Sequence, residues 1–274
     1  MIPGQIPEHR KRELLEKIYS HYHGLHYLHP DPLEFVYRFR RDEDREIAGL
    51  LSAGMALGRV SSISSVLEWI FARLNEPCEM CRVMDRGDFY RLFEGFVYRF
   101  YRVDMLAELL RGIGAVLSRF GSLEACFDAY RPEENGLNGA LSGLYGEIYR
   151  GTTGEQRRIL PDPQGMSACK RLHLFLRWMI REDEVDPGCW RSIAPRHLIV
   201  PLDTHMLRFA RLFGFTERVT GDARAAIEVT KGFQKFDFDD PVRYDFSVTR
   251  LGIHPEGSFA ELERQIEQIE GRSE

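Results

Sequence analysis

Apolar residues recur at steps of three and four along most of this chain, and this helical periodicity is the feature that most restricts its fold. Strand signals are sparse by comparison, so the expected class is all-α. Periodic segments predict helices over 7–22, 61–74, 104–119, 122–130, 138–149, 167–181, 223–233, 241–251 and 258–269. Two more helices are expected to open at Asp42 and at Asp203, the second ending at Gly214, a residue type typical of helix ends.

The chain is long enough to bury a substantial core, because 274 residues suffice for one large domain or two small ones. Its net charge of −5 gives no global basic field, so binding to nucleic acid by charge alone is not favoured. The charged segment 1–17 lacks the apolar core of a signal peptide, and no apolar run approaches the roughly 18 residues of a membrane span. We therefore expect a cytoplasmic protein without a membrane partner.

Neither the cysteines nor the histidines form a standard metal-binding pattern. Five cysteines are typical of a reducing compartment rather than a disulfide framework. Cys78 and Cys81 form one Cys-x-x-Cys pair, but no second pair follows to complete a zinc or iron–sulfur site. Four histidines lie within residues 21–29 at spacings that fit no common ligand set. We expect no metal and no cofactor.

Lys170 stands out because this chain otherwise places arginine almost everywhere it carries a cation. It has 32 arginines and only five lysines, and Lys170 is the one lysine between residues 17 and 231. An arginine guanidinium does not lose its proton in proteins, whereas a neutral lysine amine is a nucleophile. The dipole of the predicted helix, with Arg171 and Arg177 nearby, favours the neutral amine. The alternative is an ordinary solvated residue on a helix surface.

Asp203 is the expected partner of Lys170. It lies at the predicted start of a helix in the segment 201–208, Pro-Leu-Asp-Thr-His-Met-Leu-Arg. A carboxylate at this point either caps the helix or stabilises positive charge in a reaction, and the sequence leaves both roles open. His205 and Arg208 are three residues apart and are expected on one side of the same helix.

The segment 201–208, followed by Arg-Leu-Phe-Gly at 211–214, resembles the Val-Asp-Thr-His-Val-x-Arg signature of the helix-hairpin-helix DNA glycosylase superfamily, the endonuclease III group. Residues 47–54, Ile-Ala-Gly-Leu-Leu-Ser-Ala-Gly, resemble an early helix of that group. Residues 168–172 fall where the family leaves its hairpin, and 239–252 resemble the helix after the catalytic aspartate. The combination is still more similar to a bacterial family of unknown function thought to share that fold.

The resemblance implies an enzyme of DNA base-excision repair, with both glycosylase and abasic-site lyase activity. Lys170 falls at the position of the Schiff-base lysine and Asp203 at that of the catalytic aspartate. It also implies that DNA is the partner, contacted by residues near these two. The expected nucleic-acid contacts are Ser167, Ala168, Arg171, Arg177, His205 and Arg208.

Three departures from the family pattern bear on substrate choice. The family hairpin Leu-Pro-Gly-x-Gly holds a DNA phosphate, and residues 160–168, Leu-Pro-Asp-Pro-Gln-Gly-Met-Ser-Ala, have lost its Gly-x-Gly pattern. Gly54 stands where the family has an intercalating glutamine, so the resemblance implies that the space left by an extruded base is not filled. The iron–sulfur cysteines are absent, since no cysteine follows Cys189. Damaged or single-stranded DNA is therefore expected rather than intact duplex, because extruding a base then costs less.

The predicted architecture is a two-lobed helix-hairpin-helix glycosylase-like fold with the catalytic pair at a central cleft. One lobe comprises residues 35–183, and the other combines 1–34 with 184–274. Residues 182–195 are interpreted as a polar insertion. Two other functions remain open. One is a non-catalytic nucleic-acid-binding protein that keeps the fold, and the other is a helical scaffold in which Lys170 and Asp203 form a buried ion pair.

Overall fold

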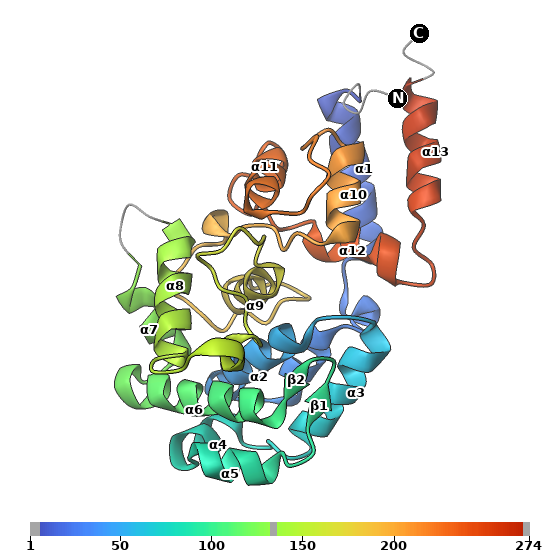
Figure 1. Ribbon diagram of the computed structural model, residues 1–274. Helices are drawn as coiled ribbons and strands as arrows, with labels where there is room; N and C mark the ends of the chain where they lie inside the picture. Colours follow the sequence, from blue (N-terminus) through green and yellow to red (C-terminus); the bar gives the residue numbers. More distant parts are fainter. Residues whose placement is uncertain (1–5, 132–135, 271–274) are drawn as a thin grey trace.

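The computed structural model describes residues 6–131 and 136–270, and the chain is mostly helical over these ranges (Figure 1). The all-α prediction is therefore confirmed. The α-helices are α1 Glu8–Tyr22, α2 Asp42–Met55, α3 Val60–Phe71, α4 Pro77–Val83, α5 Arg86–Leu92, α6 Val103–Phe120, α7 Leu123–Ala129, α8 Gly136–Ile148, α9 Lys170–Ile180, α10 Thr204–Leu212, α11 Ala223–Gln234, α12 Asp245–Ile253 and α13 Phe259–Glu270. Short 3-10 helices are η1 Leu25–Tyr27, η2 Pro32–Arg38, η3 Gly154–Arg157 and η4 Pro195–His197.

The only strands among the described residues form a small antiparallel hairpin. Strand β1, Val97–Tyr98, pairs with β2, Tyr101–Arg102. The turn between them contains Arg99 in a left-handed conformation with φ of 54°. The hairpin leads directly into α6, whose first residue is Val103.

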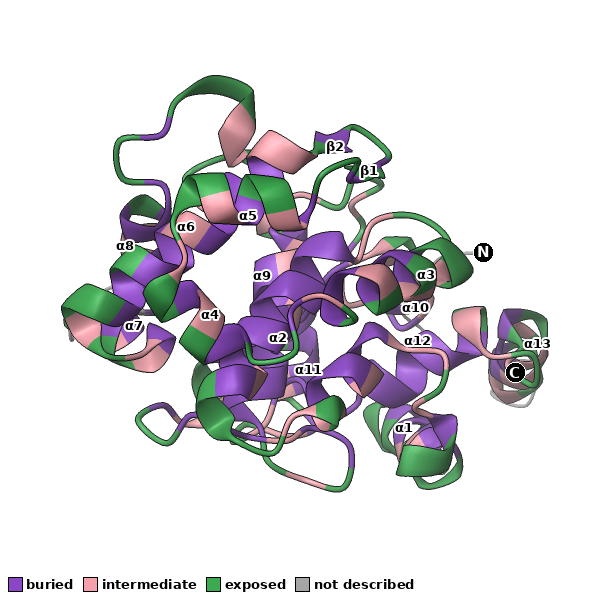
Figure 2. Ribbon diagram, turned by 90° about the horizontal axis from the view of Figure 1, so that it is seen from below, coloured by how far each residue is buried: buried purple, intermediate pink, exposed green. Residues whose placement is uncertain are grey.

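Helix α9 lies at the centre of the molecule and is almost completely buried (Figures 1 and 2). It packs against α2, and α2 in turn packs against η2 and α4. Its apolar side chains Phe175, Leu176, Trp178 and Met179 have no exposed surface. Burying one such side chain contributes about 1.5–3 kcal/mol, so this helix is a major source of stability. Helix α6 packs against α4, α5, α7 and α8 on the other side of the same group.

Helices α1 and α10 to α13 gather at the other end of the molecule (Figure 1). Helix α1 packs against α12, although more than 220 residues separate them in sequence. Helix α10 packs against both α11 and α12. The proposed lobe boundaries stay a prediction, and residues 1–5 and 271–274 of the second lobe lie outside the described residues. No described helix combines the length and the apolar character of a membrane span.

Predicted and observed helices agree best where the periodic pattern is long. The segment predicted over 104–119 is α6, and those predicted over 7–22 and 223–233 are α1 and α11, each within a residue or two. The short helices α4 and α5 were not predicted from the periodic pattern. Helix α5 is instead fixed locally by a capping box in which Asp85 and Asp88 each accept the other's backbone N–H.

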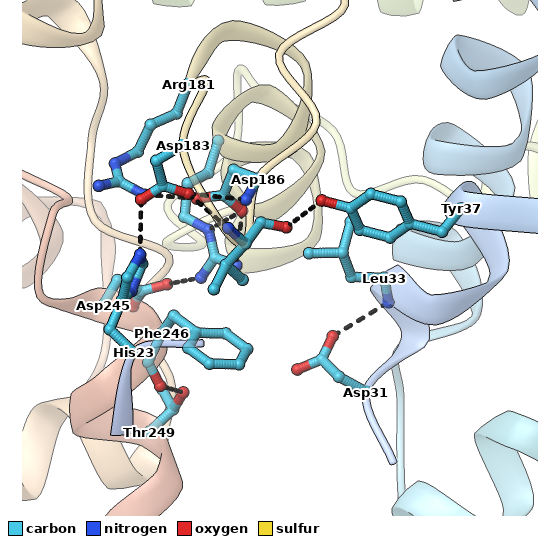
Figure 3. A network of polar contacts seen from close by, with 12 residues as sticks. His23, Asp31, Leu33, Tyr37, Arg181, Asp183, Asp186, Asp245, Phe246 and Thr249 are labelled. Atoms are coloured by element: carbon cyan, nitrogen blue, oxygen red, sulfur yellow. Dashed lines mark hydrogen bonds and ion pairs between the residues drawn. The ribbon is translucent and has the colours of Figure 1, made fainter. Parts of the chain in front are cut away.

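The segment interpreted as a polar insertion contributes Asp183 and Asp186 to an ionic cluster at the end of α9 (Figure 3). Asp186 has no exposed surface and accepts hydrogen bonds from Arg177 Nε at 3.1 Å and Arg181 Nη1 at 2.8 Å. Arg181 also pairs with Asp240 Oδ2 at 2.6 Å. Arg181 thereby joins the loop after α9 to the segment before α12. Each buried charge in this cluster has a partner of opposite charge, as a buried charge requires.

Two histidines of the 21–29 segment contact carboxylates. His23 Nε2 lies 2.8 Å from Asp183 Oδ2 at the edge of the same cluster (Figure 3). His29 Nδ1 lies 2.8 Å from Glu34 Oε2 on the surface. Within the described ranges, no group of three or more histidine, cysteine or acidic side chains is arranged to hold a metal ion.

Candidate functional site

Helix α9 begins at Lys170, three residues later than the sequence predicts. The preceding residue, Cys169, has a left-handed backbone with φ of 46°, which turns the chain into the helix. Before Cys169, Ser167 pairs with Asp222 in an isolated antiparallel β-bridge. The carbonyl of Met166 accepts a hydrogen bond from the N–H of Ala223 at 3.0 Å. The loop in the place of the family hairpin is therefore docked on the start of α11. This docking fixes the first residue of α9, Lys170, relative to the C-terminal helices.

Lys170 and Asp203 meet in the folded protein, although 33 positions separate them. Lys170 Nζ lies 3.1 Å from Asp203 Oδ2. The other carboxylate oxygen of Asp203, Oδ1, accepts the N–H of Met206 at 2.8 Å and caps α10. The cap and the ion pair with Lys170 thus coexist, because a carboxylate has two oxygens. The cap holds one oxygen in place and leaves the other directed at the amine.

This pair is accessible to solvent. The side chain of Lys170 is 36% exposed and that of Asp203 is 13% exposed. A reacting group must be reachable by its substrate, and a purely structural ion pair has no such requirement. The scaffold alternative predicts a pair sealed inside packed helices, and the exposure of Lys170 argues against it.

Arg171 anchors the first turn of α9 to two other parts of the chain. Its Nη1 donates to the carbonyl of Gly54 at 2.7 Å and to Tyr101 Oη at 2.6 Å, and it also contacts the carbonyl of Ile159. One guanidinium thus joins the start of α9 to the end of α2 and to the β-hairpin. Arg171 is half-buried and holds Lys170 in position from the following residue.

Gly54 packs closely against the segment that precedes α9. A Cβ atom at Gly54 would lie 3.2 Å from Cγ2 of Ile159 and 3.5 Å from Cδ2 of Leu160. These apolar side chains come from the segment before the docked loop. An added side chain would press on Ile159, so the glycine suits the close packing of residues 159–160 against α2.

The other predicted contact residues divide into exposed and buried positions. Ser167 is exposed, whereas Ala168 is buried against the core. Arg177 is also buried, with its guanidinium bound to Asp186 and Asp245. That guanidinium is committed to two carboxylates inside the protein and has no surface on which to meet a phosphate.

His205 and Arg208 face the last helix. The ring of His205 stacks on Phe259 with centroids 6.2 Å apart, and Arg208 Nη2 pairs with Glu263 Oε1 at 2.7 Å. Arg208 is exposed and its pair with Glu263 is worth at most about 1 kcal/mol, so a phosphate could displace the carboxylate. These two residues lie on the same helix as Asp203 but on the side that meets α13.

Two further residues near Lys170 were not singled out from the sequence. The hydroxyl oxygen of Tyr101, in the β-hairpin, accepts a hydrogen bond from Arg171, and burial raises the pKa of that hydroxyl, so it remains neutral. Met166, four residues before Lys170, is 88% exposed, which is unusual for a large apolar side chain. No periodic pattern or motif indicates either residue, because the position of each side chain depends on a loop conformation that the sequence pattern does not specify.

Residues 31–254 match a family described as a protein of unknown function, DUF2400. The match covers most of the chain, including both Lys170 and Asp203. The chain belongs to the DUF2400 family. No curated protein and no solved structure matches this DUF2400 chain at a significant level. Membership therefore carries no function with it, and the resemblance to the glycosylase superfamily remains a hypothesis that rests on the motifs themselves.

Proposed function

We propose that this protein is a DNA base-excision glycosylase with abasic-site lyase activity, in which Lys170 is the nucleophile and Asp203 the stabilising carboxylate. The observation that carries the proposal is the 3.1 Å approach of Lys170 Nζ to Asp203 Oδ2 at a solvent-accessible position. It is supported by the local devices that hold the two groups. Asp203 is fixed as the cap of α10, and Lys170 is flanked by the anchored Arg171.

The reaction uses the two groups in sequence. The bond between sugar C1′ and the base breaks, the base leaves with the electron pair, and the positive charge on the sugar is stabilised by Asp203. The neutral amine of Lys170 then bonds to C1′, which requires that its ion-pair proton first pass to solvent or to the departing base. Opening of the sugar ring gives an imine. Removal of a C2′ proton then expels the 3′ phosphate by β-elimination.

The altered loop before α9 supports a substrate whose base is already unstacked. The family hairpin holds a duplex phosphate with two glycines, and here the equivalent loop is docked on α11 through Met166 and Ser167. Extruding a base from intact duplex costs a few kcal/mol, and less from damaged or single-stranded DNA. Because the loop lacks the glycines that hold a duplex phosphate, damaged or single-stranded DNA is the favoured substrate.

Borohydride trapping tests the proposal directly. The protein is incubated with an oligonucleotide containing one abasic site, and borohydride reduces any imine to a stable covalent adduct seen on a denaturing gel. We expect an adduct with the unaltered protein and none with Lys170→Gln. Lys17→Gln is the matched control, since Lys17 is an exposed lysine on α1, and it should trap normally. An adduct of equal yield in Lys170→Gln would refute the assignment.

A non-catalytic nucleic-acid-binding protein is the second candidate, favoured by the loss of the hairpin glycines. It predicts binding of the same oligonucleotide without trapping, and a binding constant that falls steeply with salt. The two candidates are separated in one experiment when trapping and fluorescence anisotropy are measured on the same DNA. The absence of both adduct and binding would reject both.

A further inference from the structure

Three of the five lysines of this chain converge on one cavity at the junction of α1, α10 and α11. Lys11, Lys231 and Lys235 line a space of about 270 Å³. Arginine outnumbers lysine more than sixfold in the chain, so this concentration is unlike the rest of the molecule. The cavity lies apart from the Lys170–Asp203 pair, which is not among its lining residues.

Lys11 is the buried member of the group. Only 8% of its surface is exposed, and its Nζ donates to the carbonyl of Phe213 at 2.6 Å. This carbonyl belongs to the end of α10, where Gly214 adopts a φ of 65° and the N–H of Phe215 returns to Ala210 at 2.8 Å. An ammonium has three N–H donors and this bond uses one of them, so the amine retains donors on the cavity side.

The other two lysines are not neutralised by the protein. Lys235 Nζ lies 3.8 Å from Glu8, a loose contact between two largely exposed side chains. Over the ranges that the structure describes, no carboxylate lies within ion-pair distance of Lys231. The second acidic residue of the lining, Glu228, is already bound to Arg218 at 2.8 Å. The cavity therefore carries an excess of positive charge.

The floor of the cavity is aromatic. Phe215 and Phe236 line it, with ring centroids 5.9 Å apart. Phe215 lies directly over Gly232 of α11, where a Cβ atom would come within 2.4 Å of the ring. The glycine thus allows the ring to pack against the helix. An apolar floor beneath converging ammonium groups suits a ligand with a flat body and an anionic end.

We propose that this cavity binds the phosphate monoester of a small ligand, with Lys11, Lys231 and Lys235 around the phosphate and the body of the ligand over Phe215 and Phe236. Lysine is suited to this role because its ammonium is a compact charge with three donors on a flexible stem. Burial and the nearby Lys235 lower the pKa of the Lys11 amine, and a bound dianion relieves that unfavourable charge. The site is independent of the proposed repair activity.

Calorimetric titration with three probes tests the site: inorganic phosphate, adenosine 5′-monophosphate and adenosine. We expect the monophosphate to bind and adenosine not to bind. Inorganic phosphate shows which kind of ligand the site takes. If it binds as tightly as the monophosphate, the ligand is free phosphate; if it binds more weakly, the ligand is a nucleotide. Lys231→Ala should weaken binding on the order of tenfold, the loss of one charge-assisted contact. Lys17→Ala, which removes an exposed lysine of α1 outside this cavity, should not.

Lysine side-chain resonances provide a second readout that needs no variant of the buried Lys11. Biosynthetic carbon-13 labelling of lysine reports all five Cε signals and leaves the three N–H donors of each ammonium intact. The monophosphate should shift the titration of the Lys11 Cε signal to higher pH and leave that of Lys17 unchanged. The site is rejected if adenosine binds as tightly as its monophosphate, if Lys231→Ala binds unchanged, or if the Lys11 signal does not respond at millimolar ligand.

Discussion

Replacing Arg177 by methionine should destabilise the protein strongly, because this guanidinium lies between two fully buried carboxylates. Arg177 donates to Asp186 through Nε at 3.1 Å and Nη2 at 3.0 Å, and its Nη1 contacts Asp245. Methionine keeps the packing of the stem but removes every one of these bonds. Asp186 retains Arg181, whereas Asp245 loses the one cation that contacts it among the described residues. Breaking a buried pair from one side costs about 3–5 kcal/mol.

The same variant should show a characteristic dependence on pH. Burial raises the pKa of Asp245 to about 6 even with Arg177 present. Without the cation this pKa rises further, and each unit is worth about 1.4 kcal/mol. When the pKa of a carboxyl is higher in the folded than in the unfolded protein, the carboxyl stabilises the fold at pH values below its unfolded pKa. That stabilisation is lost as the pH rises through the folded pKa. The deficit of Arg177→Met should thus be larger at pH 7.5 than at pH 5.

Urea unfolding followed by circular dichroism at both pH values measures this deficit. A loss of about 4 kcal/mol would lower the melting temperature by roughly 10 °C for a chain of this size. The matched control is Arg191→Met, since Arg191 is an exposed arginine bound to the exposed Glu182, and its loss should cost no more than about 1 kcal/mol. A deficit below about 1 kcal/mol for Arg177→Met, or one equal at the two pH values, would contradict the reasoning.

Three further predictions follow from single sites. Burial lowers the pKa of His173 to about 4, below its unfolded value, so the stability that the neutral ring contributes is present above about pH 6.5 and is lost as the pH falls toward 4. His173→Phe should remove this pH dependence, which is worth about 3 kcal/mol in the free energy of unfolding. Urea titrations at several pH values measure it. Gly112→Ala should lower the melting temperature because a Cβ there would lie 1.9 Å from a carbonyl of α8, whereas Gly146→Ala, with open space around it, should raise stability by up to about 1 kcal/mol. Asp203→Asn should keep the cap of α10 and change the free energy of unfolding by less than about 0.5 kcal/mol. It should abolish release of the base from a damaged oligonucleotide but leave borohydride trapping on an abasic site, where no base departs.

The Lys170–Asp203 pair illustrates how far the candidate site was predictable. The sequence indicated both residues, one by its isolation among arginines and the other by its place at a helix start. The structure adds the 3.1 Å contact and the coexistence of cap and ion pair. It also separates the predicted contact residues, since Ser167 remains on the surface while Arg177 is buried. Helical spacing could not predict that Arg177 is buried, because its carboxylate partners lie outside the helix that carries it.

The sequence by itself determined that the chain is helical, and where its long helices run, because amphipathic periodicity is a local property of neighbouring residues. Only the tertiary structure decided which charges are buried, as in the loop after α9, and which lysines share a cavity. Lys11 and Lys231 are 220 positions apart, and they meet because α1 packs against the C-terminal helices. Burial and proximity between distant segments are set by how the helices pack together, and no local pattern specifies them.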